Sequence, residues 1–261
     1  MDASLWIAKT GLDAQQTRMA VIANNLANVN TIGFKQDRAS FEDMLYQNLR
    51  KPGSQIGANA QSPTGLMLGT GVRMVSTQKA YTQGSLITTK NALDIAIQGD
   101  GFYQILQPDG TTAYTRDGTF KLSSTGQIVT SNGSALQPAI TIQPGVTSIA
   151  IGQDGSVSVE VPGQAAMQVV GQIQLARFVN PAGLQAIGQN LLKETQASGA
   201  PVLSNPGVTG TGLLQQGALE ASNVNVVEEM VTMIETQRAY EINSKAISAV
   251  DGMLRFINNN M

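Results

Sequence analysis

The sequence predicts an α+β protein. Its expected core is coiled-coil-like, formed by an antiparallel pair of long N- and C-terminal helices, with an antiparallel β-rich domain inserted between them. Apolar residues repeat at helical spacing near both ends, turn dipeptides recur through the middle, and "NVN" occurs twice. The expected domains are terminal helices at 1–34 and 223–261 forming an inner core, a connector at 35–83 that includes a long irregular segment at 46–72, and a β-rich outer domain at 84–222.

The first helix is predicted from an apolar seam whose members are separated alternately by three and four residues. The seam consists of Leu5, Ala8, Leu12, Gln15, Met19, Ile22, Leu26 and Val29. This spacing is typical of a helix that packs along a partner helix, although an ordinary core helix produces the same periodicity. We therefore place Leu5, Leu12, Met19, Ile22 and Leu26 at an assembly interface.

The second helix is predicted from a stripe that is wider than one partner helix can cover. The stripe contains Val226, Met230, Met233, Gln237, Tyr240, Ser244, Ile247 and Leu254, and further valines and isoleucines widen it. A helix that is apolar on more than one face needs more than one neighbour, and other copies of the same chain could supply them. We assign Met230, Met233, Tyr240, Ile247 and Leu254 to the same interface.

Asparagines mark the ends of both predicted helices. Asn28 or Asn30 can end the first helix, and Gly33 permits a sharp exit, because these residue types tolerate left-handed backbone conformations. Asn223 and Asn225 stand where the second helix begins, and Asn225 is a suitable N-cap. We also assign to the assembly interface the asparagines and glycine at these helix ends: Asn24, Asn25, Asn28, Asn30, Gly33, Asn223 and Asn225.

Asn24 and Asn25 lie one turn earlier, beside the seam. Interfacial amides need hydrogen-bond partners. We expect these two side chains to bond across a helix interface.

The middle of the chain reads as short strands separated by tight turns. The turn signals are "GDG" at 99–101, "PDG" at 108–110, "RDG" at 116–118, "STG" at 124–126, "SNG" at 131–133 and "QDG" at 153–155. Asp-Gly and Asn-Gly supply the positive φ angles that hairpin turns require. On this reading Arg116 and Asp117 flank a turn in solvent rather than forming a charged pair of an enzyme. Residues 46–72 are rich in Gly, Ser, Gln, Asn and Pro, and we expect them to be irregular.

Composition excludes several classes of function. The chain has no Cys and no His, which removes disulfides, thiol chemistry and histidine-based catalysis. We expect no enzyme activity, no cofactor and no metal, and the net charge of −2 without a basic cluster argues against nucleic acid. No stretch approaches 18 apolar residues, so we expect no membrane span, and the N-terminus does not resemble a cleaved signal peptide.

Three long motifs together resemble the flagellar rod and hook axial-protein family, closest to its distal rod members. They are "SLWIAKTGLDAQQTRMAVIANNLANVNTIGFK" at 4–35, "GDGFYQILQPDGTTAYTRDGTF" at 99–120 and "SNVNVVEEMVTMIETQRAYEINSKAISAVDGML" at 222–254. The resemblance implies a structural subunit that is exported by the flagellar type III apparatus and polymerises into a rigid helical tube. This tube would act as a drive shaft from motor to hook and as the wall of the export channel.

The resemblance also implies the surroundings of the polymer. The subunit would lie in the basal-body rod, in the periplasm and reaching the outer membrane. Its partners would be other copies, proximal rod proteins, hook protein, and the P and L ring proteins. The segment matching 46–72 would add subunit contacts. Alternatives are another axial protein, such as a proximal rod or hook subunit, or a secreted multimeric adhesin or cap protein. An enzyme that cleaves peptidoglycan is a third, weaker reading.

Overall fold

The computed structural model describes residues 3–57, 60–163, 166–208 and 210–259. The chain forms two compact units. The first, called here the helical unit, contains the residues up to Leu26, Asp37–Gln78 and the residues from Asn225 onward. The second, the β-rich unit, contains Ala27–Gln36 and Lys79–Val224.

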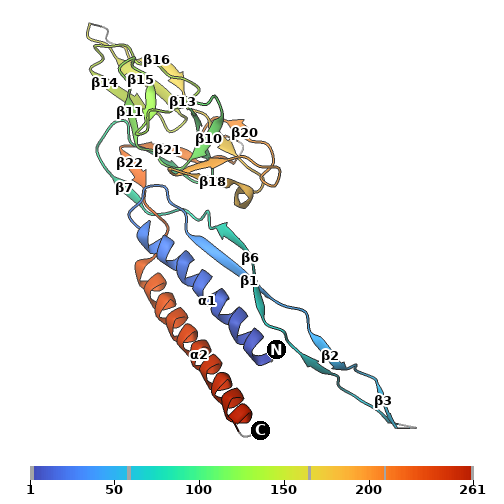
Figure 1. The fold of residues 1–261 in the computed structure, drawn as a ribbon. Coiled ribbons are helices and arrows are strands. Elements are labelled where there is room, and N and C mark those ends of the chain that lie inside the picture. Colours follow the sequence, from blue (N-terminus) through green and yellow to red (C-terminus); the bar gives the residue numbers. More distant parts are fainter. Residues whose placement is uncertain (1–2, 58–59, 164–165, 209, 260–261) are drawn as a thin grey trace. The chain divides into compact units, whose positions relative to one another are not determined.

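The helical unit contains both helices and an antiparallel ribbon. Helix α1 spans Ala3–Ala27 and helix α2 spans Val226–Asn259, and the two lie side by side (Figure 1). Strands β1 (Asp37–Asp43) and β6 (Val72–Lys79) pair in a two-stranded sheet. No helix within the described ranges is both long enough and apolar enough to cross a membrane.

The prediction of a coiled-coil-like core made of two paired long helices is wrong. The face of α2 that meets α1 carries Glu229, Thr236 and Asn243 at seven-residue intervals, and the first two are 4% and 1% exposed. The backbone of Gly11 approaches this face so closely that an added Cβ would lie 3.1 Å from Asn243 Nδ2. Polar and small side chains cannot form an apolar knobs-into-holes seam, and the apolar stripe of α2 stays largely exposed.

Residues 46–72 form a β-hairpin, which corrects the expectation of an irregular segment. Strand β2 (Gln47–Arg50) pairs antiparallel with β5 (Leu66–Leu68), and β3 (Gln55–Gly57) pairs with β4 (Ala60–Gln61) nearer the tip. The strands are only two to four residues long, and β2 and β5 are exposed along their whole length, so no buried face imposes an alternating pattern on these two strands. Their sequence therefore carries little strand signal.

The β-rich unit is built from antiparallel pairs, as the turn signals predicted. A 9-stranded sheet follows the order β11-β12-β13-β9-β10-β19-β18, with β17 joined to β9 and β20 joined to β17. Its strands are β9 (Phe102–Leu106), β10 (Thr112–Thr115), β11 (Phe120–Leu122), β12 (Ile128–Thr130), β13 (Ala135–Gln137), β17 (Leu175–Arg177), β18 (Gln185–Gly188), β19 (Leu191–Lys193) and β20 (Val202–Ser204). A short 3₁₀ turn at Pro181–Gly183 precedes β18.

Three smaller groups of strands complete this unit. A three-stranded sheet contains β14 (Ser148–Ile151), β15 (Ser156–Glu160) and β16 (Gln168–Gln172). Strand β8 (Ile95–Gln98) pairs with β21 (Leu213–Gln216), and β7 (Leu86–Thr88) pairs with β22 (Ala218–Glu220). Residues far apart in the chain therefore meet where the chain enters and leaves the unit.

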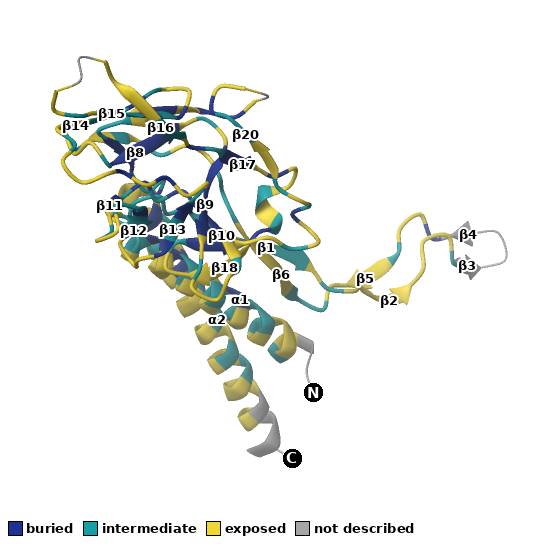
Figure 2. Ribbon diagram, turned by 90° about the horizontal axis from the view of Figure 1, so that it is seen from above, coloured by how far each residue is buried: buried dark blue, intermediate teal, exposed yellow. Residues whose placement is uncertain are grey.

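The main apolar core lies within the β-rich unit. Figure 2 shows buried residues concentrated on β8, β9, β10 and β17, whereas α1 and α2 are mostly intermediate or exposed. The rings of Tyr103 and Phe120 pack edge to face at 5.0 Å between centroids, and Tyr114 packs against Phe178 at 4.8 Å. Such aromatic pairs add stability beyond the area that they bury.

Most of the predicted turns are confirmed. Gly110, Gly126, Gly133 and Gly155 have φ angles of 81°, 79°, 84° and 87° in the turns between paired strands. The "RDG" signal at 116–118 is different, because Gly118 is packed against the β8 backbone. An added Cβ there would lie 1.7 Å from the carbonyl oxygen of Ile95.

Candidate junction and assembly surface

Three segments come together where the chain enters and leaves the β-rich unit; residues 33–36, 80–85 and 218–223 are called here the junction. The Gly33 amide donates to the Glu220 carbonyl at 2.8 Å, and the Ala221 amide donates to the Ser85 carbonyl at 2.8 Å. The Ala80 amide donates to the Gln36 carbonyl at 2.8 Å. These backbone bonds tie the first, middle and last parts of the unit together.

A buried charge cluster lies at the junction. Lys35 Nζ donates to Glu220 Oε1 at 2.6 Å and to the Thr82 carbonyl at 2.8 Å, and Lys35 and Glu220 are 3% and 1% exposed. Arg116 Nη1 lies 3.6 Å from Glu220 Oε2, and Arg116 Nη2 donates to the Gly99 carbonyl at 2.8 Å. One carboxylate therefore faces two buried cations.

The burial of this cluster is reflected in the pKa of Lys35. Desolvation lowers the pKa of Lys35 below its ordinary value, and the hydrogen bond that Lys35 donates to Glu220 opposes that shift. Glu220 also accepts the Gly84 amide at 3.0 Å. A buried charge that loses its partner is strongly destabilising, so the folded unit depends on Glu220.

Sequence reasoning missed this cluster, and it placed Arg116 in solvent. That expectation is wrong, because Arg116 is 5% exposed. Two signals were available. Glu220 is the one charged residue in "GALEAS", and charged residues make up only 13% of the chain. Lys35 lies two residues after the Gly33 exit, just before the chain leaves the first segment of the β-rich unit.

Asn223 forms an amide tie at the junction. Its Oδ1 accepts the Gln36 amide at 2.7 Å, and its Nδ2 donates to the Ala80 carbonyl at 2.8 Å and to the hydroxyl of Thr82 at 2.8 Å. One side chain thus joins three segments of the β-rich unit, which helix punctuation alone does not require.

Asn25 forms a second amide tie, within the helical unit. Its Oδ1 accepts the Asp37 amide at 2.8 Å, and its Nδ2 donates to the Asp37 carbonyl at 2.9 Å and to Glu229 Oε1 at 3.0 Å. Asn25 is 1% exposed. Asn24 is exposed, and its Nδ2 donates to Asp37 Oδ2 at 3.3 Å. The expected bond across a helix interface thus joins Asn25 on α1 to α2 of the same chain.

The remaining asparagines and Gly33 lie at the ends of the helices or in the turn that follows α1. Helix α1 ends at Ala27, and the Asn28 carbonyl accepts the Thr31 amide at 3.1 Å. Asn30 is exposed, and Gly33 has a φ of 69°. Asn225 caps α2, because its Oδ1 accepts the Val227 amide at 3.1 Å, which confirms the predicted N-cap.

The predicted interface residues of the helices differ in burial. On α1, Ile22 is 4% exposed, whereas Leu5, Leu12, Met19 and Leu26 are half-buried. On α2, Met233 and Ile247 are half-buried, whereas Met230 and Tyr240 are 51% and 39% exposed. The side chain of Leu254 lies outside the described residues.

An exposed apolar face covers α2. Its members are Val226, Val227, Met230, Val231, Ile234, Tyr240, Ile242 and Met253, each exposed by more than a third. Many exposed apolar side chains gathered along one helix mark an interaction site more often than a solvated face. Within the described ranges, no group of acidic side chains could hold a metal ion. The exposed apolar side chains of α2 can bind another protein surface.

Comparisons with known proteins define the class to which this fold and surface belong. Three family models match: "Flagella basal body rod protein" at residues 5–35, "Flagellar hook protein FlgE/F/G D1 domain" at 96–159, and "Flagellar basal body rod FlgEFG protein C-terminal" at 215–260. The chain belongs to the family of flagellar basal-body rod proteins, which are structural subunits of the rod. The resemblance found in the sequence is thereby confirmed.

Several relatives carry the name of one rod component, FlgG. The chain is 56% identical to the flagellar basal-body rod protein FlgG of Buchnera aphidicola subsp. Schizaphis graminum, over 97% of each chain. It is 50% identical to FlgG of Borreliella burgdorferi, over 98% of this chain and 97% of that protein. It is 49% identical to FlgG of Caulobacter vibrioides, over 97% of each chain. These relatives indicate a place in the flagellar basal-body rod.

Proposed function

We propose that the chain is a distal rod subunit that polymerises with other copies into a rigid helical tube. The tube acts as the drive shaft that carries torque from motor to hook, and its lumen is the export channel. The exposed apolar face of α2 carries this proposal. In water such a face favours association, and identical copies that make heterologous contacts build a helix rather than a closed ring.

The proposal assigns each part of the chain a place in the tube. The terminal segments 1–34 and 223–261 form the inner core, and other copies cover the apolar face of α2. Residues 84–222 form the outer domain, and the hairpin within 35–83 contacts neighbouring copies. Exposed apolar side chains on that hairpin, such as Leu49 and Met67 at 57% and 48% exposure, support this role.

The partners follow from this place. They are other copies of the chain, proximal rod proteins below, hook protein above, and the P and L ring proteins outside. The subunit leaves the cytoplasm through the flagellar type III apparatus, and the tube lies in the periplasm and reaches the outer membrane.

Electron microscopy of purified protein tests the proposal. The wild-type chain should form straight hollow rods. Val231→Asp places a charge in the exposed apolar face, so it should abolish rods while the β-rich unit stays folded. Glu241→Gln changes an exposed polar position of the same helix and should leave rods intact. Rods formed equally by all three chains would refute the role of the α2 face, and failure of the wild-type chain to form rods would refute the polymer.

A further inference from the structure

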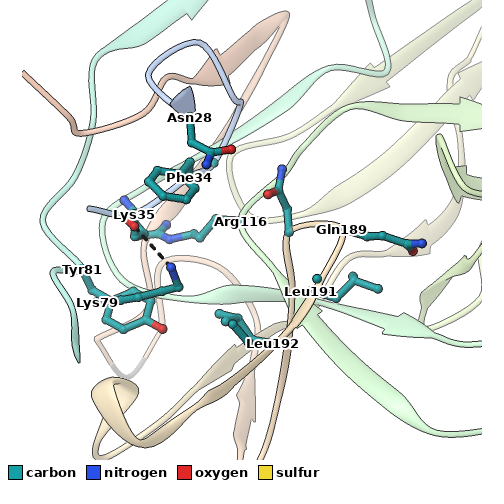
Figure 3. A pocket seen from close by; sticks show the side chains of 13 residues that line it. Asn28, Phe34, Lys35, Lys79, Tyr81, Arg116, Gln189, Leu191 and Leu192 are labelled. Atoms are coloured by element: carbon teal, nitrogen blue, oxygen red, sulfur yellow. Dashed lines mark hydrogen bonds between the residues drawn. The ribbon is translucent and has the colours of Figure 1, made fainter. Parts of the chain in front are cut away.

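A cavity of about 240 Å³ opens beside the junction of the β-rich unit, and it is called here the Phe34 pocket. Figure 3 shows its lining side chains. Apolar surface comes from Phe34, Tyr81, Leu191 and Leu192, and the cations are Lys35, Lys79 and Arg116. A pocket with an apolar floor and several cations fits a group that is apolar and also carries a carboxylate.

Positive charge exceeds the negative charge nearby. Among the described residues, Glu220 is the one carboxylate paired with Lys35 and Arg116, and Asp100 acts on Lys35 from farther away. Among the described residues, Nε and Nη1 of Arg116 are buried without a hydrogen-bond acceptor. These cations make the pocket electrically complementary to an incoming anion.

Lys79 is the cation best placed to meet such a group. Its Nζ lies 4.8 Å from the centroid of the Phe34 ring and donates to the Lys35 carbonyl at 3.5 Å, a long hydrogen bond (Figure 3). The side chain is half-buried. An ammonium held over an aromatic ring beside open space can bind a carboxylate with little further ordering.

One wall of the pocket is a strained hairpin turn. Gln189 and Asn190 join β18 to β19 with φ angles of 55° and 59°, and such turns favour Asn-Gly. Asn190 Nδ2 donates to the Ile32 carbonyl at 3.2 Å, and the Asn190 carbonyl accepts the Thr115 hydroxyl at 2.8 Å. Positive φ at two consecutive non-glycine residues costs free energy, and sites that keep such strain are often functional.

A complementary group lies at the base of the hairpin in the helical unit, and it is called here the Leu45 knob. Leu45 is 89% exposed, Tyr46 is 53% exposed, and the carboxylate of Asp43 is exposed beside them. A hydrogen bond with Asp43 raises the pKa of Tyr46. The knob therefore presents a protruding apolar side chain and a carboxylate a short distance apart.

We propose that the Phe34 pocket of one copy receives the Leu45 knob of a second copy, with Leu45 on the apolar wall and Asp43 facing Lys79. This inference rests on the proposed polymer and deepens it, because it names one contact between copies. Charge complementarity and the need to cover Leu45 both favour this occupant over a small anion, which would leave the apolar wall in water.

Cysteine cross-linking tests the contact, because the natural chain has no cysteine. One preparation carries Leu45→Cys and another carries Gln189→Cys at the pocket rim, and the two are mixed before assembly and oxidation. We expect a disulfide-linked dimer in rods and none in dilute monomer. The matched control replaces Gln189→Cys with Asp109→Cys, an exposed turn residue that does not line the pocket.

The outcomes separate the contact from the polymer. Rods in which Leu45→Cys links to Gln189→Cys no more than to Asp109→Cys overturn the docking and leave the polymer standing. A third preparation carries Leu45→Cys and Gln189→Cys in the same chain. A disulfide that forms only within this doubly substituted chain, and not between the two singly substituted chains, also overturns the docking. Failure of the unmodified chain to form rods overturns both.

Charge reversal gives an independent test. Lys79→Glu opposes Asp43 and should reduce the extent of assembly about fivefold, with the melting temperature of the β-rich unit retained. Adding Asp43→Lys restores opposite charges and should recover most of the loss. Equal assembly by the Lys79→Glu chain and the unmodified chain, or no recovery in the double variant, would contradict the assigned pair.

Discussion

The substitution Glu220→Gln tests the buried charge cluster most directly. It keeps the shape of the side chain and removes the carboxylate that, among the described residues, alone lies within hydrogen-bond or ion-pair distance of Lys35 and Arg116, at 2.6 Å and 3.6 Å. Breaking a buried ion pair by removing one partner costs about 3–5 kcal/mol of unfolding free energy. For a unit of this size, that loss lowers the melting temperature on the order of 10 °C.

Thermal and urea unfolding followed by circular dichroism measure the effect. Glu160→Gln is the matched control, because Glu160 is an exposed carboxylate that bonds Ser148 at 2.8 Å, and it should change stability by about 0.5 kcal/mol or less. The double variant Lys35→Met with Glu220→Gln also removes one of the two unpaired cations. It should therefore regain about half of the unfolding free energy that Glu220→Gln loses. If the unfolding free energy of the Glu220→Gln variant lies within ~1 kcal/mol of that of the unmodified chain, the cluster does not stabilise the junction.

Three further predictions concern other parts of the chain. Asn25→Ala removes the three hydrogen bonds of a buried side chain and should cost about 3 kcal/mol of unfolding free energy, seen as faster amide exchange in β1. Asn24→Ala at an exposed position should have little effect, and similar exchange in both variants would contradict the tie. Burial raises the pKa of Tyr114 to about 12, so this residue stabilises the fold below pH ~10 and the contribution is lost as pH rises toward 12. The unfolding free energy of the Tyr114→Phe variant, relative to that of the unmodified chain, should therefore rise by about 1 kcal/mol from pH 7 to pH 11. Urea unfolding at both pH values measures this, and a difference between the two chains that does not change with pH would refute it. In Gly118→Ala the added methyl group meets a backbone carbonyl, so the unfolding free energy should fall by about 3 kcal/mol or more. Gly252→Ala lies in open space on α2 and should stabilise the helix by roughly 0.5–1 kcal/mol. Equal melting curves for the two variants would argue against the close packing at Gly118.

Helix ends and turns could be predicted from the sequence because they depend on neighbouring residues. Asn225 caps α2 through the second amide after it, and Gly133 supplies a positive φ within its own turn. The hairpin at 46–72 could not be predicted in this way. Its ladder joins Gln47 to Leu68, and the residues between them carry no alternating pattern.

The predicted assembly residues show the same difference between local features, which the sequence predicts, and contacts between segments, which it does not. Periodicity placed apolar residues on α2 correctly, but it did not reveal which face meets α1. That face carries Glu229, Thr236 and Asn243. Asn25 on α1 donates to Glu229, and Gly11 lets the α1 backbone come close to Asn243. Many apolar side chains of α2 consequently stay exposed, whereas Met233 and Ile247 are half-buried.

The sequence by itself determined the α+β class, the ends of both helices, most of the tight turns and membership of a structural family. These features follow from backbone preferences and from motifs that lie within single segments. Only the tertiary structure decided that Arg116 is buried, that Lys35 and Glu220 form an ion pair, and that Asn223 joins three segments. These contacts bring together residues that are far apart in the chain, and burial then makes their charges and amides depend on one another.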